Sequence, residues 1–474
     1  MCCDLISGQL DDVWVPCWGA NRLFGPKLSP KYVEVDNNGV LMTVHLPKGT
    51  RDHLPEKMSQ RLRVVDIMRG VFRRYGFEPL ETPAFERIET LMGKYGDEGE
   101  QLIYKILKRG KGGERGEVDL ALRYDLTVPL ARVIAMNPGL RMPFKRFQTQ
   151  PVWRADRPQK GRYREFVQCD VDTVGTTSMM ADAECLAVLH DCLVELGFNA
   201  FTIRLNHRGL LRAIVDSAGL SEMETTVLVA VDKLDKIGRD GVNKELAGFG
   251  VTTEAMEKLW SMFSLRGDGA LDELANSLGD AGASAIADLR EVVGFALAMG
   301  VSAERLQFDP VLARGLGYYT GPVFEAEVVE PKIGSIAGGG RYDGLVGVFS
   351  KRDVPAVGVS LGLDRVVTVM DELGLLSQYS SGSTVMVAVY SEELRSEAVR
   401  VATAFRSEGL ATTLVLDRVG KLGKQFKAAH SAGISWVAVV GPDDQVAGRV
   451  SLKEMATGDQ FSLTISEAVE KLKA

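Results

Sequence analysis

Residues 144–174 read FKRFQTQPVWRADRPQKGRYREFVQCDVDTV, and they predict two long strands joined by a charged loop. The strands would span Phe144–Trp153 and Glu165–Val174. Successive side chains of a strand point to opposite faces of its sheet. One face of the second strand would therefore present Phe166, Gln168, Asp170 and Asp172, and the other Val167, Cys169 and Val171. This alternation predicts a sheet with one apolar face and one face that carries chemistry.

The loop between these strands, Arg154–Arg164, holds five cations in eleven residues. A guanidinium group matches the geometry of a phosphate, so ATP or RNA would satisfy such a loop. A solvated hairpin tip is the usual explanation for an isolated run of charge. The chemical face of the strand that follows favours an anion site instead.

Polar residues on and near the second strand suit an amino acid ligand. Gln168 and Asp172 lie four residues apart on one face, about 13 Å between their Cα atoms, and could bracket a small amino acid. Asp172 would suit an imidazole nitrogen. Asp125 would suit an ammonium group, with Thr127 as its neutral partner. Either carboxylate could also be a plain surface charge, and Asp125 could cap the helix predicted at 127–135.

A glycine-containing segment, LARGLGYYTG at residues 312–321, places Arg314 beside two tyrosines. Its glycines would let the backbone approach a ligand closely. Neighbouring side chains on a strand face opposite ways, so only one tyrosine would enter the site. We favour Tyr319 over Tyr318, and a half-buried position in the core is the alternative for both.

A second arginine lies where the strand of AVGVSLGLDR, residues 356–365, is expected to run into a helix. Arg365 would occupy the first helical turn, where its charge opposes the helix dipole and needs compensation. A phosphate would supply that compensation. An ion pair with Asp364 or another acid is the alternative.

Length and composition set broad limits on the function. The 474 residues predict two or three domains, and 56 basic against 63 acidic residues argue against indiscriminate coating of nucleic acid. Six cysteines without a CxxC pair indicate reduced thiols of an intracellular protein. There is no apolar run of membrane-spanning length and no leader pattern at the start, so the expected location is the cytoplasm.

The pattern along the chain predicts three parts. Residues 1–45 lack any period and form an irregular extension. A body follows at 46–380, interrupted by a helical insertion at about 208–305. Residues 381–474 alternate between strand and helix, which predicts a small three-layer α/β domain with a largely parallel core.

Together the motifs resemble those of the class II aminoacyl-tRNA synthetases, and within that class the histidyl enzymes. The resemblance covers about residues 46–474 and rests on six segments. Four are similar to the opening segment and the three class motifs: LPKGTRD (46–52), GFEPLETPAFE (76–86), Val152–Gly175 and Gly358–Arg365. LARGLGYYTG and AGGGRYDGL (337–345) resemble the two segments that distinguish histidyl enzymes.

The resemblance implies a fold and a reaction. The catalytic domain would contain an antiparallel sheet of six or seven strands flanked by helices, with a helical insertion, and an α/β anticodon-binding domain would follow. Such enzymes join L-histidine to tRNA(His) through a histidyl-adenylate, using ATP and Mg²⁺, and they are homodimers. A regulatory paralogue that senses histidine is the alternative, but it would lack the anticodon-binding domain and some catalytic segments.

The resemblance also implies roles for individual residues. Arg314 and Arg154 would be catalytic. The histidine site would comprise Asp125, Leu126, Thr127, Gln168, Asp172, Tyr318 and Tyr319, and the ATP site Arg154, Asp156, Arg162, Phe166 and Arg365. The tRNA would meet Gln159 and Arg164, and also Lys421 and Lys424 from a three-residue repeat of cations at Arg418, Lys421, Lys424 and Lys427. No protein side chain is assigned to a metal.

Among the departures from the family pattern, one concerns a residue beside the tyrosine pair. Gly317 stands where an acidic residue usually lies between the leucine and the tyrosine pair. A carboxylate that would support the site is therefore missing or comes from elsewhere in the chain.

Overall fold

A computed structural model describes residues 45–92, 96–267, 269–315, 317, 319–331, 333–350, 352–377, 384–416 and 420–473. It also describes the backbone of two short antiparallel strands, β1 (Val33–Val35) and β2 (Leu41–Thr43). These strands belong to a unit of residues 1–48, separate from residues 49–474. The rest of the predicted N-terminal extension lies outside the described residues.

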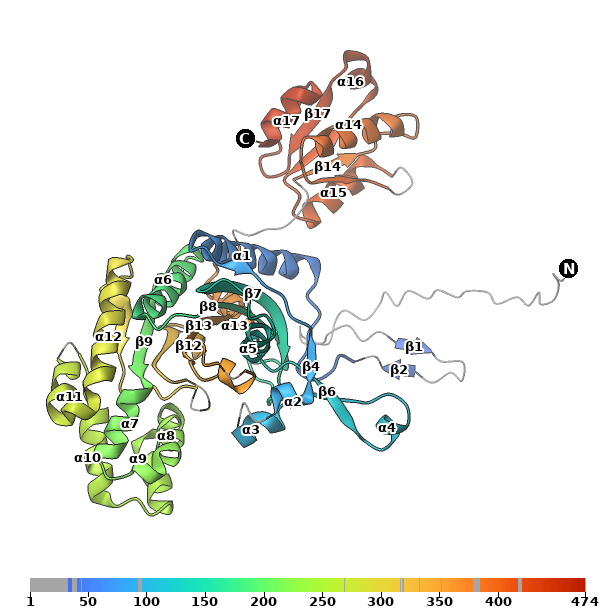
Figure 1. The fold of residues 1–474 in the computed structure, drawn as a ribbon. Coiled ribbons are helices and arrows are strands. Elements are labelled where there is room, and N and C mark those ends of the chain that lie inside the picture. The colour runs from blue at the N-terminus through green and yellow to red at the C-terminus, as the bar shows by residue number, and fades with distance from the viewer. Residues whose placement is uncertain are drawn as a thin grey trace. The chain divides into compact units, whose positions relative to one another are not determined.

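An eight-stranded sheet forms the centre of the catalytic body, in the order β10-β9-β11-β12-β13-β8-β7-β3 (Figure 1). The strands are β3 (Glu78–Pro79), β7 (Phe144–Trp153), β8 (Glu165–Val174), β9 (Phe201–His207), β10 (Leu306–Phe308), β11 (Pro322–Val328), β12 (Ser335–Arg341) and β13 (Ala356–Gly362). The inner pairs are antiparallel, whereas β3 and β10 lie parallel to their neighbours. The expected antiparallel sheet of six or seven strands is therefore wrong in number and at both edges. Strands of two and three residues are too short to show a two-residue period.

The register aligns the side chains in rows across this sheet. On one face, a row comprises Gln148, Asp170, Ser360, Gly338, Glu325 and Arg204. The adjacent row on that face comprises Arg146, Asp172, Gly358, Gly340, Val323 and Asn206. Between them, on the opposite face, lie Phe147, Val171, Val359, Gly339, Phe324 and Leu205. The predicted alternation is confirmed, and we call the first of these two faces the polar face.

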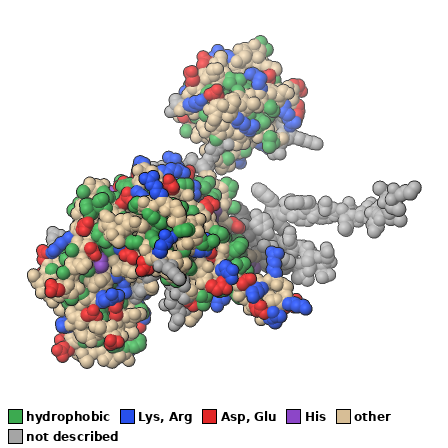
Figure 2. Space-filling model, viewed as in Figure 1, with side chains coloured by type: hydrophobic (Ala, Val, Ile, Leu, Met, Phe, Trp, Pro, Cys, Tyr) green, Lys and Arg blue, Asp and Glu red, His purple; other side chains and the backbone are tan. Residues whose placement is uncertain are grey.

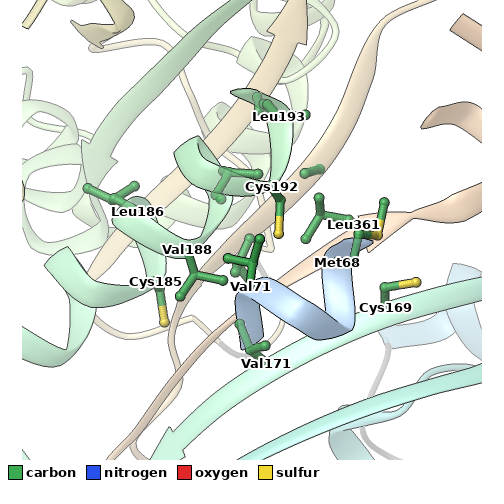
Figure 3. Packing of buried hydrophobic residues seen from close by; sticks show 14 of the residues in the cluster. Met68, Val71, Cys169, Val171, Cys185, Leu186, Val188, Cys192, Leu193 and Leu361 are labelled. Carbon is green, nitrogen blue, oxygen red and sulfur yellow. The ribbon is translucent and has the colours of Figure 1, made fainter. Parts of the chain in front are cut away.

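The apolar face packs against helices and forms the main core. These helices are α1 (Pro55–Arg74), α6 (Met179–Glu195), α12 (Asp280–Ala298) and α13 (Leu363–Glu372). In Figure 3, Met68 and Val71 of α1 lie close to Val188 and Cys192 of α6. Cys169, Cys185 and Cys192 are free thiols in this core, and burial raises the pKa of Cys169 to about 12.

Helices also fill the chain between β9 and β10. They are α7 (Arg208–Ser217), α8 (Glu224–Val231), α9 (Leu234–Gly248), α10 (Thr253–Phe263) and α11 (Ala270–Leu278), followed by α12. A separate core of buried residues, including Leu210, Leu228 and Phe263, holds them together. Short 3-10 turns lie at Ser221–Met223, Ala303–Arg305 and Val346–Val348.

A small three-stranded sheet lies beside the entry to the polar face. Its strands are β4 (Phe85–Arg87), β5 (Lys105–Leu107) and β6 (Val118–Leu122) in the order β4-β6-β5. Its helices are α2 (Ile88–Leu91), α3 (Gly96–Gln101), α4 (Lys111–Glu114) and α5 (Thr127–Met136). After β6 the chain turns directly into α5, so the residues between these two elements have little freedom of position.

Residues 384–473 form a domain with its own sheet, ordered β15-β14-β16-β17-β18. Its elements are β14 (Val385–Ala388), α14 (Arg395–Ser407), β15 (Thr412–Leu414), α15 (Leu422–Ser431), β16 (Trp436–Val439), α16 (Pro442–Ala447), β17 (Val450–Glu454), β18 (Gln460–Leu463) and α17 (Ile465–Lys473). The first three strands are parallel, as predicted. The antiparallel β17 and β18 were not predicted. Among the described residues, no helix is both long and apolar enough to cross a membrane.

The glycines of β12 provide a test of this packing. A Cβ atom on Gly339 would lie 2.2 Å from the Gly358 carbonyl oxygen and 2.8 Å from the Val359 Cα. A Cβ atom on Gly338 would meet nothing closer than 3.6 Å. We expect Gly339→Ala to lower the free energy of unfolding by about 3 kcal/mol, because backbone must move, and Gly338→Ala by less than about 1 kcal/mol. Urea unfolding followed by circular dichroism measures both, and equal midpoints would contradict this packing.

Candidate active site

Asp172 is buried on the polar face, near the C-terminal end of β8. Its Oδ2 lies 2.7 Å from Nη2 of Arg146, and its Oδ1 accepts a hydrogen bond from the Tyr342 hydroxyl. Burial raises the pKa of Asp172, while Arg146 and Tyr342 act to lower it. A Cβ atom on Gly358 would lie 2.0 Å from Asp172 Oδ1, so the carboxylate needs glycine at that position.

Gln168 lies on the same face as Asp172, next to β13. Its Nε2 donates a hydrogen bond of 2.8 Å to the Ser360 hydroxyl. Its Oε1 is buried and has no hydrogen-bond partner among the described residues. A buried amide oxygen without a partner is costly, so it is suited to accept an N–H from a bound ligand.

The residues before α5 lie against these strands. Asp125 Oδ1 accepts a hydrogen bond of 3.1 Å from the backbone N–H of Val128, so Asp125 supports the start of the helix, as the alternative interpretation held. The Leu126 carbonyl accepts a hydrogen bond of 3.3 Å from Arg146, and Thr127 begins α5. Asp125 is buried, although a carboxylate normally prefers water. A helix-capping role alone therefore does not explain why the Asp125 carboxylate is buried.

Arginines gather at the other end of the polar face. The pKa of Arg365 is lowered by burial and by the charges of Arg314, Arg162 and Arg154, while Glu325 acts to raise it. Arg365 does not pair with Asp364, because that carboxylate pairs with Arg61 at 2.8 Å and also with Arg51. Its guanidinium instead donates to the carbonyls of Gly161 and Ser335. Mutual repulsion of these cations favours the binding of a polyanion.

The other predicted phosphate-site residues have partners of their own. Arg162 pairs with Asp156 at 2.9 Å. The Arg154 guanidinium lies 4.3 Å from the centroid of the Tyr124 ring and 5.2 Å from that of Phe166, and its Nε donates to the Tyr124 carbonyl. Two aromatic rings and a carbonyl thus fix the direction of Arg154 without neutralising its charge.

The structure gives a local reason for one glycine near the predicted catalytic arginine. Gly315 has φ +64°, and a Cβ atom there would lie 1.9 Å from the Tyr319 ring. Tyr319 is partly buried against the cluster that includes Val128 and Tyr342. Tyr318 lies outside the described residues.

Glu325 of β11 is a carboxylate that contacts the predicted catalytic arginine Arg314. It is buried and pairs with Arg314, whose side chain is about half exposed, and with Arg204 at 3.0 Å. A strand residue on the polar face therefore orients an arginine from a loop.

Sequence reasoning missed the residues that complete the polar face from neighbouring strands: Arg146, Tyr342, Ser360, Glu325 and Arg204. A signal existed for two of them. Tyr342 belongs to the quoted segment AGGGRYDGL, and Arg146 alternates with Gln148 and Gln150 on the first long strand. The register that joins them to Asp172 could not be derived from either strand alone.

The predicted tRNA contacts lie on the loop between β7 and β8 and at the start of α15. Gln159 pairs through its backbone with Arg162, and the Arg164 side chain donates to the Asp156 carbonyl. Lys421 directly precedes α15, while Lys424 and Lys427 lie exposed on it, so these two of the four predicted cations lie on the described helix. Arg418 lies outside the described residues.

Two further features of the surface were not predicted. Lys and Arg side chains gather over the hairpin tip that carries α4 (Figure 2). The exposed cations there are Lys105, Lys108, Arg109, Lys111 and Arg115. In the C-terminal domain, a cavity of about 210 Å³ is lined by Tyr390, Leu422, Phe426, Lys453 and Gln460, among others. Both combine positive charge with accessible surface, which suits contact with a nucleic acid.

Comparison with known proteins agrees with this arrangement. The model of the family described as Histidyl-tRNA synthetase matches residues 49–366, and that described as Anticodon binding domain matches residues 384–474. The histidine--tRNA ligases of Cytophaga hutchinsonii and Gloeobacter violaceus are 42% and 40% identical to the chain, covering 90% and 89% of it and 99% and 96% of their own lengths. The crystal structure of histidyl-tRNA synthetase from Nostoc sp. PCC 7120 is similar with a TM-score of 0.81 and 32% identity, over 91% of this chain and 99% of that one. The chain belongs to the histidyl-tRNA synthetase family.

Proposed function

We propose that this chain attaches L-histidine to tRNA(His) in the cytoplasm, as a histidine--tRNA ligase. The histidine carboxylate attacks the α-phosphate of ATP, which forms histidyl-adenylate and releases diphosphate. The histidyl group then passes to the tRNA, and AMP leaves. One observation carries the proposal: buried acceptors for an amino acid and a group of arginines suited to a polyphosphate lie on the same face of one sheet.

The histidine would lie along β8. Asp125, Thr127 and the free Oε1 of Gln168 would accept the ammonium group, with the Leu126 backbone nearby. Asp172 and Tyr319, with Tyr318 beside it, would face the imidazole. An amino acid without ring nitrogens would donate no hydrogen bond to Asp172, so an apolar competitor is rejected.

The ATP would extend toward the arginines. Arg154 would contact both the α-phosphate and the histidine carboxylate, and Phe166 would stack on adenine. Arg365 would bind the γ-phosphate, with Arg162 and Asp156 beside it. Attack of one anion on another needs fixed positive charge, and Arg314 would supply it as charge develops on the α-phosphate.

Mg²⁺ would arrive with the ATP. Among the described residues, no three His, Cys, Asp or Glu side chains are grouped so that they could hold a metal ion. The phosphate oxygens and water would therefore provide most of its ligands, as this ion prefers. Its charge would help to neutralise the β- and γ-phosphates.

The tRNA would use two surfaces. Gln159 and Arg164 lie on the charged loop between β7 and β8, where the acceptor end must reach the adenylate. In the C-terminal domain, Lys421 and Lys424 are exposed beside the cavity that Leu422 and Phe426 line. Such a cavity suits an unstacked base, and the lysines suit the phosphates that flank it.

A stripe of exposed apolar side chains on α1 supports a homodimer. Leu54, just before α1, and Met58 and Leu62 within it are spaced four residues apart and are 71%, 39% and 49% exposed. Residues at this spacing share one face of a helix. Burial of that stripe against a second copy would remove it from water.

The non-catalytic paralogue is the weaker candidate. It would lack the anticodon-binding domain, whereas residues 384–474 match that family. ATP–diphosphate exchange with each amino acid in turn discriminates between the two. Exchange that depends on histidine alone supports the ligase, and its absence contradicts it.

Arg314→Ala tests the proposed catalytic arginine. We expect exchange to fall by at least about 100-fold while histidine binding survives, because the charge matters most as the α-phosphate reacts. Arg290→Ala on α12 removes an exposed arginine and serves as the control. Wild-type exchange in Arg314→Ala would refute the assignment.

Charge reversal on α15 tests the tRNA surface. We expect Lys421→Glu with Lys424→Glu to raise the KM for tRNA at least about tenfold and to leave histidine-dependent exchange unchanged. The matched control reverses Arg395 and Arg400 on α14, which packs on the other side of the domain's sheet. An unchanged KM for tRNA would remove these lysines from the interface.

The α1 stripe is tested by molecular mass. We expect Met58→Glu with Leu62→Glu to yield monomers in light scattering, because two charges cannot be buried in an apolar interface without partners. Arg63→Glu, which changes an exposed residue on another side of α1, should leave the mass unchanged. A dimer that persists in the double variant would place the interface elsewhere.

A further inference from the structure

Arg146 is a buried cation that sits between two buried carboxylates. Its side chain has no exposed surface, and its Nη2 lies 2.7 Å from Asp172 Oδ2 and 4.0 Å from Asp170 Oδ2. Among the described residues, no other cation pairs with either aspartate. Asp172 therefore depends on one guanidinium for its charge partner.

The charges at this end of the polar face do not balance. Two carboxylates face one guanidinium, and the charge of Asp125 also acts on Asp170. Burial raises the pKa of Asp170 to about 7, and its Oδ1 has no hydrogen-bond partner among the described residues. The site is thus short of positive charge and of donors, which are what the ammonium and ring N–H of an amino acid such as histidine would bring.

Arg146 also fixes the direction of the Asp172 carboxylate. Asp172 Oδ2 forms an ion pair with Arg146 of β7 but accepts no hydrogen bond among the described residues, whereas Oδ1 accepts a hydrogen bond from Tyr342, directly after β12. The same guanidinium donates to the Leu126 carbonyl at 3.3 Å and to Gln148 Oε1 at 3.3 Å. It therefore ties the proposed imidazole end of the site to the loop that carries the proposed ammonium end.

We propose that Arg146 is a positioning residue for the selection of histidine, which keeps Asp172 anionic and aimed at the imidazole. This inference rests on the proposed function. Without the guanidinium, a buried Asp172 takes up a proton and can no longer accept the ring N–H as a carboxylate. Arg146 itself does not touch the reacting atoms.

Other groups near Asp172 must be considered in any pH profile. They are Asp170 on its own strand, Tyr342 after β12 and Cys185 on α6, whose thiol pKa lies well above its ordinary value. Of these groups, Asp170 has a pKa raised to about 7 by burial. The test is therefore made both in the wild-type background and in Asp170→Asn, where Asp172 is the sole carboxylate beside Arg146.

The variant is Arg146→Met, assayed by ATP–diphosphate exchange between about pH 6 and pH 9. We expect the KM for histidine to rise about 100-fold at neutral pH, with kcat and the KM for ATP within about threefold of wild type. The increase in the KM for histidine should become smaller as the pH rises, because Asp172 loses its proton once the pH exceeds its raised pKa. Arg146→Lys, which restores charge without the fork, should recover the pH profile but only part of the affinity.

Arg123→Met is the matched control. Arg123 is also a fully buried arginine, but it donates to the carbonyls of Thr82, Pro83 and Pro151 and to Gln150, and no carboxylate pairs with it among the described residues. Its loss should lower the melting temperature without changing the pH dependence of the KM for histidine. A purely structural Arg146 would behave in the same way.

The outcomes separate this inference from the proposed function. If the wild-type chain shows no histidine-dependent exchange, the proposed function fails. If the wild-type chain shows histidine-dependent exchange, the inference about Arg146 can be judged by itself. It is overturned if Arg146→Met changes kcat, the KM for histidine and the KM for ATP to the same extent and leaves the pH profile unaltered. Should Arg146→Met not fold, its combination with Asp170→Asn buries one charge fewer and must show the same pH-dependent KM.

Discussion

The alternation of side chains across the eight-stranded sheet is the constraint on which the rest of the structure depends. Most residues that face the helices are apolar, with the buried ion pair between Arg341 and Asp182 of α6 as an exception, and the residues between them point to the other side. The register aligns this alternation over six strands, so polar groups from sequence positions 146 to 360 meet on one face. Gly338, Gly340 and Gly358 have no side chains to cover that face, and the Asp172 carboxylate occupies the space that a side chain at Gly358 would fill.

Buried charge on such a face has to be matched across strands. Glu325 is held by Arg204 and Arg314, and Asp172 by Arg146. Pairs of this kind add little stability, because desolvation offsets their attraction, but removing one partner is costly. They therefore restrict which strands can be neighbours. The charges are not fully matched at either end of the polar face. Carboxylates are in excess near Asp170, which suits the ammonium group of an amino acid. Guanidinium groups are in excess near Arg365, which suits a polyphosphate.

The sequence predicted the parts of this arrangement that are local. Both long strands, the faces of β8 and the start of α5 follow from patterns within one segment. The edge strands β3 and β10 and the C-terminal β17 and β18 were missed, since short or irregular strands leave no clear period. Arg146, Ser360 and Glu325 were missed for another reason. Each meets its partner through pairing between strands that are distant in sequence, and no local pattern encodes that register.

Gly317 leaves this position of the loop without a carboxylate, and the carboxylate that pairs with Arg314 is Glu325 of the sheet. A carboxylate on the loop would have to be ordered together with the arginine that it supports, whereas Glu325 is already fixed by β11 and by Arg204. Formation of the sheet has then already ordered the Glu325 carboxylate, so the loop loses no additional conformational entropy to order a carboxylate of its own. Gly315 adds to this, because its left-handed conformation lets Tyr319 lie against the loop backbone. Arg314 is thus held by Glu325 from the sheet, and of the two supports only the contact of Gly315 with Tyr319 lies within residues 312–321.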